Sequence, residues 1–327
     1  MGEVHKSRSI RLLVFIVIAL AAFLLSNVVD ELRVFQGASL SVYIVAIASI
    51  VLLTGYSGQI SLGHGALMAI GGYSAVLAHN HWKVSIPISF AIAIVSTAFF
   101  GSILGWAAAR LKGPYLAGTT LALAVGLPSL ANQFSVLGGE QGLAFDVGAP
   151  PKSLGSDFTQ YKWYFWICAL AALIIVWITQ NILTSRYGRQ WRAMRSAPIS
   201  ASLSGIHIGR SKVLAFTISS GIAGLAGAML VMTLNLVTPS AFPLSLSFAI
   251  VTGAVLAGVT NLGGGVIGAL VLVAIPDIAD LLAGKMGGAE KISANLPGFI
   301  TSLILIVTVL LLPNGPKLSK LVSHKTK

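Results

Sequence analysis

Side chains that could carry out chemistry are scarce in this sequence. The 327 residues include nine Asp and Glu, six His and a single cysteine, Cys168. One cysteine inside an apolar stretch can form neither an intrachain disulfide nor a thiolate metal cluster. No GxxxxGK[ST] phosphate-binding loop occurs, and no Ser/His/Asp set or metal-ligand spacing stands out. The sequence therefore predicts no catalytic site, no metal site and no cofactor, so the chain is not expected to be an enzyme.

The composition is that of a protein that resides in lipid. Hydrophobic residues make up 56% of the chain and charged residues 9%, and the mean hydropathy is +0.89. A globular domain carries about 25% charged residues. In a soluble protein the net charge of +12 would suggest a nucleic-acid partner, but here the basic residues gather in a few connections between apolar runs. We predict a protein of the lipid bilayer with no nucleic-acid partner.

Apolar runs predict the fold class: an all-α, polytopic transmembrane helical bundle of about ten membrane segments, each needing roughly 20 apolar residues. The runs lie at about 12–29, 38–54, 66–79, 86–109, 116–136, 163–183, 213–236, 246–262, 266–283 and 296–312. They leave no room for a large soluble domain, so residues 1–327 form one transmembrane domain. If the N-terminus is cytoplasmic, alternation places every strongly basic connection on that side, and both termini are predicted to be cytoplasmic.

Acidic residues are nearly absent from the predicted membrane segments. Only Asp277 and Asp280 fall within an apolar run, and they lie near its predicted outer end. Ion-coupled carriers commonly need carboxylates near mid-membrane to bind the driving ion. Energy for uphill transport must therefore come from another subunit.

The glycine-rich stretch 55–65, GYSGQISLGHG, is the leading candidate for a translocation path. The apolar run after it, 66–79, is too short to span about 30 Å unaided, so part of the stretch is expected at membrane depth. Non-helical backbone is tolerated there where it is buried in protein or lines a watery cavity. The alternative is close helix packing, in which His64 is a hydrogen-bonded structural residue. The predicted path residues are Gly55, Gly58, Gln59, Ser61, Gly63 and His64.

A second glycine cluster, 261–265, separates the eighth and ninth apolar runs. Its sequence, NLGGG, favours a tight turn over a second broken element, because consecutive glycines are costly inside a helix. Asn261, Gly263 and Gly264 are its predicted path residues.

The longest polar connection on the predicted outer side is 137–161, which is rich in turn-forming Gly and Pro. Two interpretations stand side by side. The connection docks an external partner, or it is a solvated loop.

The basic stretch 185–212 is the most informative part of the chain. Arg189, Arg192 and Arg195 are three apart and predict one face of a short helix that Pro198 interrupts. Apolar residues that a solvated loop would not need are Trp191, Met194, Leu203, Ile206 and Ile208. The pattern alone does not decide between an amphipathic cytoplasmic helix that docks in a partner's groove and a basic helix on anionic lipid headgroups.

Four blocks of sequence resemble the branched-chain amino acid ABC transporter permeases of the LivM type. They are GYSGQISLGHGALMAIGGYSA at 55–75, RLKGPYLAGTTLAL at 110–123, SRYGRQWRAMRSA at 185–197 with GIHIGRSKVLAFTISSGIAGLAGAML at 205–230, and LAGVTNLGGGVIGALVL at 256–272. The tail LLPNGPKL is similar to the short basic ending of the same group. The resemblance covers nearly the whole chain.

The resemblance implies a multi-pass subunit of the cytoplasmic (inner) membrane. Its partners would be a homologous permease subunit, two ATP-binding-cassette ATPase subunits and an external solute-binding protein. Residues 185–212 would form the cytoplasmic ATPase-coupling loop. The implied coupling residues are Arg189, Arg192, Ala193, Arg195, Ala201 and Gly205. One departure is the centre of the loop, 198–202, which reads PISAS where family members usually carry acidic residues.

The expected function is import of leucine, isoleucine or valine delivered by the external binding protein. Related permeases carry urea, short amides or other amino acids, which is the alternative for the solute. A stand-alone channel or carrier is the alternative of another class, and the basic-apolar loop would be superfluous in it.

Overall fold

The computed structural model describes residues 15–17, 19–110, 114–151, 158–285 and 290–311, and the regular secondary structure within them is helical apart from one pair of two-residue strands. The first elements are a helix at Phe15–Val28, α2 (Glu31–Ile50), the π-helix η1 (Val51–Tyr56), α3 (His64–Trp82), α4 (Ile86–Arg110), α5 (Pro114–Gln133), β1 (Leu143–Ala144) and α6 (Gln160–Thr184). The remaining elements are α7 (Arg186–Ser196), α8 (Pro198–Leu203), α9 (Ile208–Leu234), β2 (Leu236–Val237), α10 (Leu244–Leu256), α11 (Gly265–Lys285) and α12 (Glu290–Leu311). The predicted all-α class is confirmed.

Several helices are long and apolar enough to cross a membrane. Among the described residues five segments qualify: Glu31–Tyr56, Ile86–Arg110, Gln160–Thr184, Ile208–Leu234 and Pro239–Leu256. Phe15–Val28 and Gly265–Ala279 are shorter apolar helices. The chain is therefore a polytopic helical membrane protein, with fewer qualifying segments than the predicted runs. Helix α3 illustrates why, since His, Asn and Gly residues lower its hydropathy.

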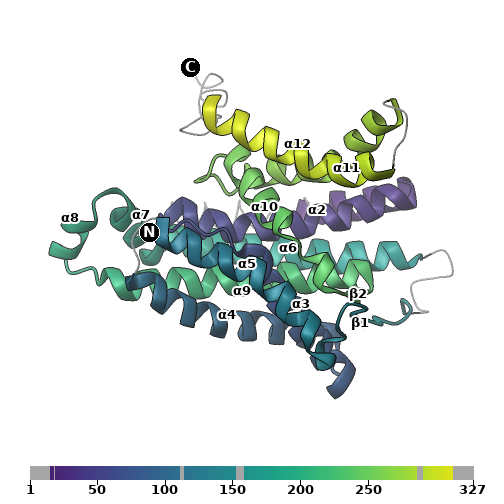
Figure 1. Cartoon of the computed structure of the whole chain (residues 1–327), viewed down its shortest axis with the longest axis horizontal. Coiled ribbons are helices and arrows are strands. Elements are labelled where there is room, and N and C mark those ends of the chain that lie inside the picture. Colours follow the sequence, from purple (N-terminus) through teal and green to yellow (C-terminus); the bar gives the residue numbers. More distant parts are fainter. Residues whose placement is uncertain (1–14, 18, 111–113, 152–157, 286–289, 312–327) are drawn as a thin grey trace.

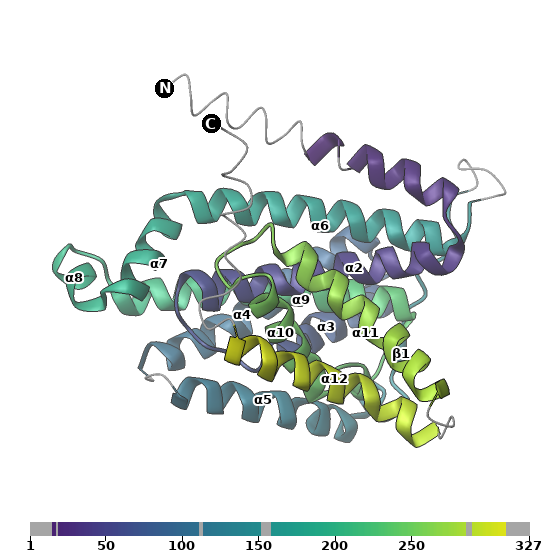
Figure 2. The ribbon, with the colours of Figure 1, turned by 90° about the horizontal axis from the view of Figure 1, so that it is seen from above.

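The predicted location of the two chain ends depends on basic residues near them. Those in 1–14 and in the tail 312–327 lie outside the described residues. Helices α7 and α8 lie at one end of the long axis of the molecule, and β1 and β2 lie toward the opposite end (Figure 1). The same separation is visible from above (Figure 2). The most basic described segment is thus confined to one end.

Helix α9 is the centre of the bundle. It packs against α2, α3 and α4, and most of its residues after Phe216 are buried. Small residues let membrane helices approach closely. A Cβ added at Gly227 would overlap the carbonyl oxygen of Met68 in α3, and one at Gly224 would overlap the hydroxyl of Thr97 in α4. The contacts of α9 with both neighbours therefore require glycine at these positions.

The chain is broken between α2 and α3. Helix α2 widens into the π-helix η1, and residues 57–63 are non-helical before α3 begins at His64. This confirms the non-helical stretch that the glycines predict. The apolar run 66–79 is short, as predicted, and the helix that contains it is longer than the run. Helix α3 has 19 residues, and its length of about 28 Å follows from the helical rise per residue. It extends beyond the apolar run 66–79 at both ends.

The part of the connection 137–161 that contains β1 folds back onto the ends of α3 and α9. Strand β1 pairs antiparallel with β2, with Leu143 opposite Val237. Phe145 is buried, and its N–H donates to the Asn235 carbonyl at 2.9 Å. The Asn80 side chain, in the last turn of α3, donates to the Ala144 carbonyl at 2.8 Å. The described part of this connection is therefore packed against the bundle, and docking of an external partner stays a prediction.

Candidate functional site

Helix α7 is anchored to the membrane helices by its own apolar face. The Ser185 hydroxyl caps the helix by accepting the Tyr187 N–H at 3.2 Å. Trp191 and Met194 are buried, and the Trp191 indole N–H donates to the Ser211 carbonyl, at the start of α9, at 3.1 Å. The predicted helix is confirmed. Trp191 and Met194 do not belong to a docking surface, because they pack within the chain.

The arginines of α7 form an exposed face next to the buried apolar face. Arg189, Arg192 and Arg195 are all exposed, as their spacing predicts, and Ala193 between them is half-buried. The Arg189 guanidinium donates to the Thr184 carbonyl at 3.3 Å, next to the start of α7. This bond satisfies a carbonyl at the C-terminal end of α6, which has no partner within its own helix.

Two of these arginines reach the π-helix that precedes the glycine-rich break. The Arg195 guanidinium donates a hydrogen bond to the Gly55 carbonyl, between residues 140 positions apart. Its side-chain carbons also lie against Gly58, where an added Cβ would be 3.0 Å from Arg195 Cγ. The Arg192 guanidinium lies 5.6 Å from the ring centroid of Tyr56. Helix α7 and the break are therefore in direct contact.

Helix α8 carries the apolar side chains that project from this end of the molecule. Ile199 is 77% exposed and Leu203 is 85% exposed, whereas Ala201 is buried. The helix ends at Leu203 and is followed by Gly205, whose φ of +84° belongs to the left-handed region. The Ile206 N–H donates back to the Ala201 carbonyl at 3.1 Å and closes the turn. A short helix with a closed C-terminal turn thus presents two large apolar side chains outward.

The glycine-rich break turns its polar side chains inward. Gln59, Ser61 and His64 are 4%, 1% and 1% exposed, whereas Ile60 is 52% exposed and Gly58 is also exposed. The side-chain amide of Gln59 donates to the Lys212 carbonyl at 3.1 Å. These polar groups therefore hold the break against the start of α9, and its outer edge consists of backbone and apolar side chains.

His64 is part of a hydrogen-bonded chain inside the bundle. Its two ring nitrogens lie 3.2 Å from the hydroxyls of Ser61 and Ser219. The Ser219 hydroxyl in turn donates to the Ser49 carbonyl of α2 at 2.8 Å. This geometry fits the structural interpretation of His64. Gly63 is equally confined, since an added Cβ would lie 3.1 Å or less from atoms of Thr120 in α5.

The two glycine clusters meet in space. A Cβ at Gly55 would overlap the carbonyl oxygen of Val259, in the turn that joins α10 to α11. This turn includes Gly258 with a φ of +79°, and α11 begins only at Gly265, so the predicted tight turn is confirmed. Within it Asn261 and Gly263 are exposed, and Gly264 is buried. Gly55 of the first cluster, in η1, therefore contacts the turn that contains the second cluster.

A comparison with protein-family models identifies the chain over most of its length. Residues 34–310 match the family described as branched-chain amino acid transport system / permease component. The chain belongs to this permease family. The family is one of transport components and not of enzymes, and the matched range includes both glycine clusters, α7 and α8.

Relatives in this permease family differ in the solute that their names give. The permease protein LivM of a high-affinity branched-chain amino acid transport system from Escherichia coli is 26% identical over 71% of this chain and 60% of its own length. The LivH permease of such a system from Salmonella typhimurium is 25% identical over 86% of this chain and 94% of its own length. The xylose transport system permease XylH of Haemophilus influenzae is 26% identical over 69% of this chain and 76% of its own length. The match to LivM thus spans about three fifths of that relative.

One solved structure also matches the permease. It is PsaBC from Streptococcus pneumoniae in complex with Fab, with a TM-score of 0.42 and 14% identity, over 89% of this chain and 95% of that chain.

Sequence reasoning missed two features of the site in this family member. The first is the buried face of α7, which consists of Gly188, Trp191 and Met194. These residues are three apart, like the arginines, and each comes one residue before an arginine. The bond between Arg195 and Gly55 has no comparable signal, because nothing local to either residue indicates the other.

Proposed function

We propose that this chain is a pore-forming subunit of an ATP-driven importer of branched-chain amino acids in the cytoplasmic membrane. It crosses about ten times with both ends inside, and the helices too short or too polar to qualify alone cross in contact with their neighbours. Its partners are a homologous permease, two ATP-binding-cassette ATPase subunits and an external solute-binding protein. Family membership and the names of LivM and LivH support this solute and this assembly.

The observation that carries the proposal is the construction of α7 and α8. Two exposed apolar side chains, Ile199 and Leu203, belong to the short helix α8. The preceding helix, α7, is fixed to the bundle by the buried Trp191. A helix that only lay on lipid would not need to be bonded to the membrane bundle through Arg195 and Gly55. This end therefore suits a groove in a separate ATPase better than a bilayer surface.

The translocation path runs, in this proposal, along the exposed edge of the break and the neighbouring turn. Gly58, Asn261 and Gly263 form that edge. Gly55 and Gly264 allow the backbones to meet, while Gln59, Ser61 and His64 hold the break from behind. Gly58, Asn261 and Gly263 have no charged side chain of their own, and the nearby Arg195 is bonded to the Gly55 carbonyl. In this proposal the edge binds its solute weakly and leaves recognition to the external binding protein.

A sugar is the second candidate for the solute, because XylH shows similar identity to this chain. Uptake of labelled leucine and labelled xylose by reconstituted vesicles separates the two. The expected result is leucine uptake that depends on the binding protein and ATP. Uptake of xylose without uptake of leucine would mean that the solute is a sugar and not an amino acid.

The docking surface is tested by replacing Ile199 and Leu203 with serine. We expect the recovery of ATPase subunits with the purified chain to fall at least about tenfold, because burying each aliphatic side chain contributes about 1.5–3 kcal/mol. Both side chains are exposed in the isolated chain, so its monodispersity should not change. The measurement is the ATPase content of the complex after affinity purification.

The matched control is Val136→Ser, which removes a 65% exposed apolar side chain near the opposite end of the molecule. It should leave ATPase recovery unchanged. Full recovery of the ATPase with the Ile199→Ser, Leu203→Ser chain would contradict the assignment of α8.

A further inference from the structure

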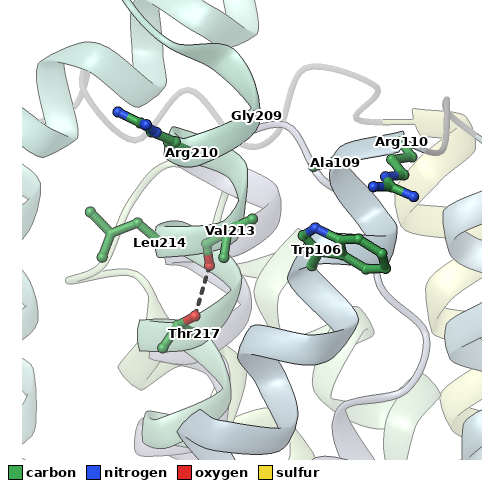
Figure 3. Close-up of a pocket in the computed structure, with 8 residues that line it drawn as sticks. All are labelled: Trp106, Ala109, Arg110, Gly209, Arg210, Val213, Leu214 and Thr217. Carbon is green, nitrogen blue, oxygen red and sulfur yellow. Dashed lines mark hydrogen bonds between the residues drawn. The ribbon is translucent and has the colours of Figure 1, made fainter.

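A groove between the end of α4 and the start of α9 lies outside the site described above (Figure 3). Its volume is about 520 Å³, and its walls include Trp106, Ala109 and Arg110 from α4 and Arg210, Val213 and Thr217 from α9. Gly209, at its mouth, has no neighbour closer than 4.0 Å to an added Cβ, so the mouth is open. Neither the break nor α8 contributes to it.

The positive charge of the groove is confined to its mouth. Arg110 is the last residue of α4 and Arg210 is in the first turn of α9, and both are exposed. The Arg110 guanidinium lies 3.8 Å above the ring of Trp106. Within the described part of the chain neither arginine has a carboxylate partner, so both remain available to an anion. Figure 3 shows the two arginines on opposite walls, with the Arg210 guanidinium directed away from Arg110, so this exposed side chain must turn to meet a shared anion.

Below the arginines the groove is apolar. The indole of Trp106, 57% exposed, and the half-buried Val213 form its walls. The Thr217 hydroxyl donates to the Val213 carbonyl at 2.9 Å within α9, so it is already satisfied. Along α4 the exposed side chains of Ile103 and Phe99 continue the apolar surface away from the charges. One end of the groove thus suits an anionic group, and the rest suits a hydrocarbon chain.

We propose that this groove binds one anionic phospholipid of the cytoplasmic leaflet. The phosphate lies between Arg110 and Arg210, and an acyl chain runs between Trp106 and Val213 toward Ile103. Basic pockets between membrane helices on the cytoplasmic side are suited to acidic headgroups, and tryptophan is favoured at that interface. The assignment to the cytoplasmic leaflet depends on the orientation given in the proposed function, whereas lipid binding by the groove does not depend on it.

The test is native mass spectrometry of the full chain mixed with equal amounts of phosphatidylglycerol and phosphatidylcholine. Wild type should retain phosphatidylglycerol preferentially. Arg110→Gln with Arg210→Gln should lower that retention at least about tenfold, because two basic contacts to the headgroup are lost. The single variants Arg110→Gln and Arg210→Gln are each compared with Arg186→Gln, which removes an exposed guanidinium of α7 at the same end and should retain the lipid.

A second variant tests whether the groove binds the whole lipid or only a phosphate group. Val213→Asp places a charge on the apolar wall and should also reduce retention, while an excess of inorganic phosphate should not displace the lipid. Unchanged phosphatidylglycerol retention in the double arginine variant, or equal retention of both lipids by wild type, would overturn the proposal. Loss of ATPase recovery with lipid retention unaltered would assign the groove to the ATPase instead. Because the isolated chain is measured, failure here is distinct from failure of the transport function.

Discussion

Replacing Arg195 with glutamine should reduce solute uptake at least about tenfold while the complex still assembles and hydrolyses ATP. The Arg195 guanidinium donates to the Gly55 carbonyl and its stem lies against Gly58, so it joins α7 to the break. Glutamine is too short to restore this bond, and a hydrogen bond from a charged group contributes about 1.5–3 kcal/mol. Uptake and hydrolysis are measured on the same reconstituted vesicles.

Arg189→Gln is the control for the loss of charge from α7. Its guanidinium bonds the Thr184 carbonyl beside the start of α7 and does not reach the break. Uptake should then remain within about threefold of wild type, as for a surface contact. Arg195→Lys, which keeps the charge, should recover part of the uptake. If the Arg195→Gln variant took up solute at the wild-type rate, the bond between Arg195 and Gly55 would not be what couples α7 to the break.

Gly227→Ala should abolish most of the monodisperse protein. The added methyl group would overlap the carbonyl oxygen of Met68, which belongs to the backbone of α3 and cannot rotate away. Overpacking a core costs about 1–3 kcal/mol even where side chains can adjust. Here two central helices would have to separate. The measurement is the fraction of the chain that elutes as a single species after extraction from the membrane.

Gly126→Ala provides the comparison, because an added Cβ at Gly126 in α5 meets nothing within 4 Å. It should match wild type in yield, since alanine is also the better helix former. Equal yields of the Gly227→Ala and Gly126→Ala chains would mean that α9 is not held as closely against α3 as described.

The sequence allowed the fold class and the main breaks between helices to be predicted, but not the residues at which each helix begins and ends. Apolar runs mark the helices, and Gly and Pro mark the breaks, because both effects depend on residues close together in the chain. The helix bearing Arg189, Arg192 and Arg195 followed from their spacing. The length of α3 did not, because His64 and Asn80 are accommodated in the helix by bonds to distant segments.

The neighbouring sequence does not predict that the polar side chains of the break point into the bundle. Gln59 and His64 face inward only because the Lys212 carbonyl and the Ser219 hydroxyl lie behind the break, and both belong to α9. A partner more than 150 residues away leaves no periodic signal. Likewise, a helix face of arginines does not reveal that Arg195 binds Gly55.

The most direct test of the account is the accessibility of Leu203→Cys to a membrane-impermeant maleimide. Cys168 is the only native cysteine and is fully buried in α6, so the new thiol is the reporter. We predict no labelling in intact cells, labelling after permeabilisation, and protection when ATPase subunits are bound. Labelling of Leu203→Cys in intact cells would place α8 outside and contradict the account.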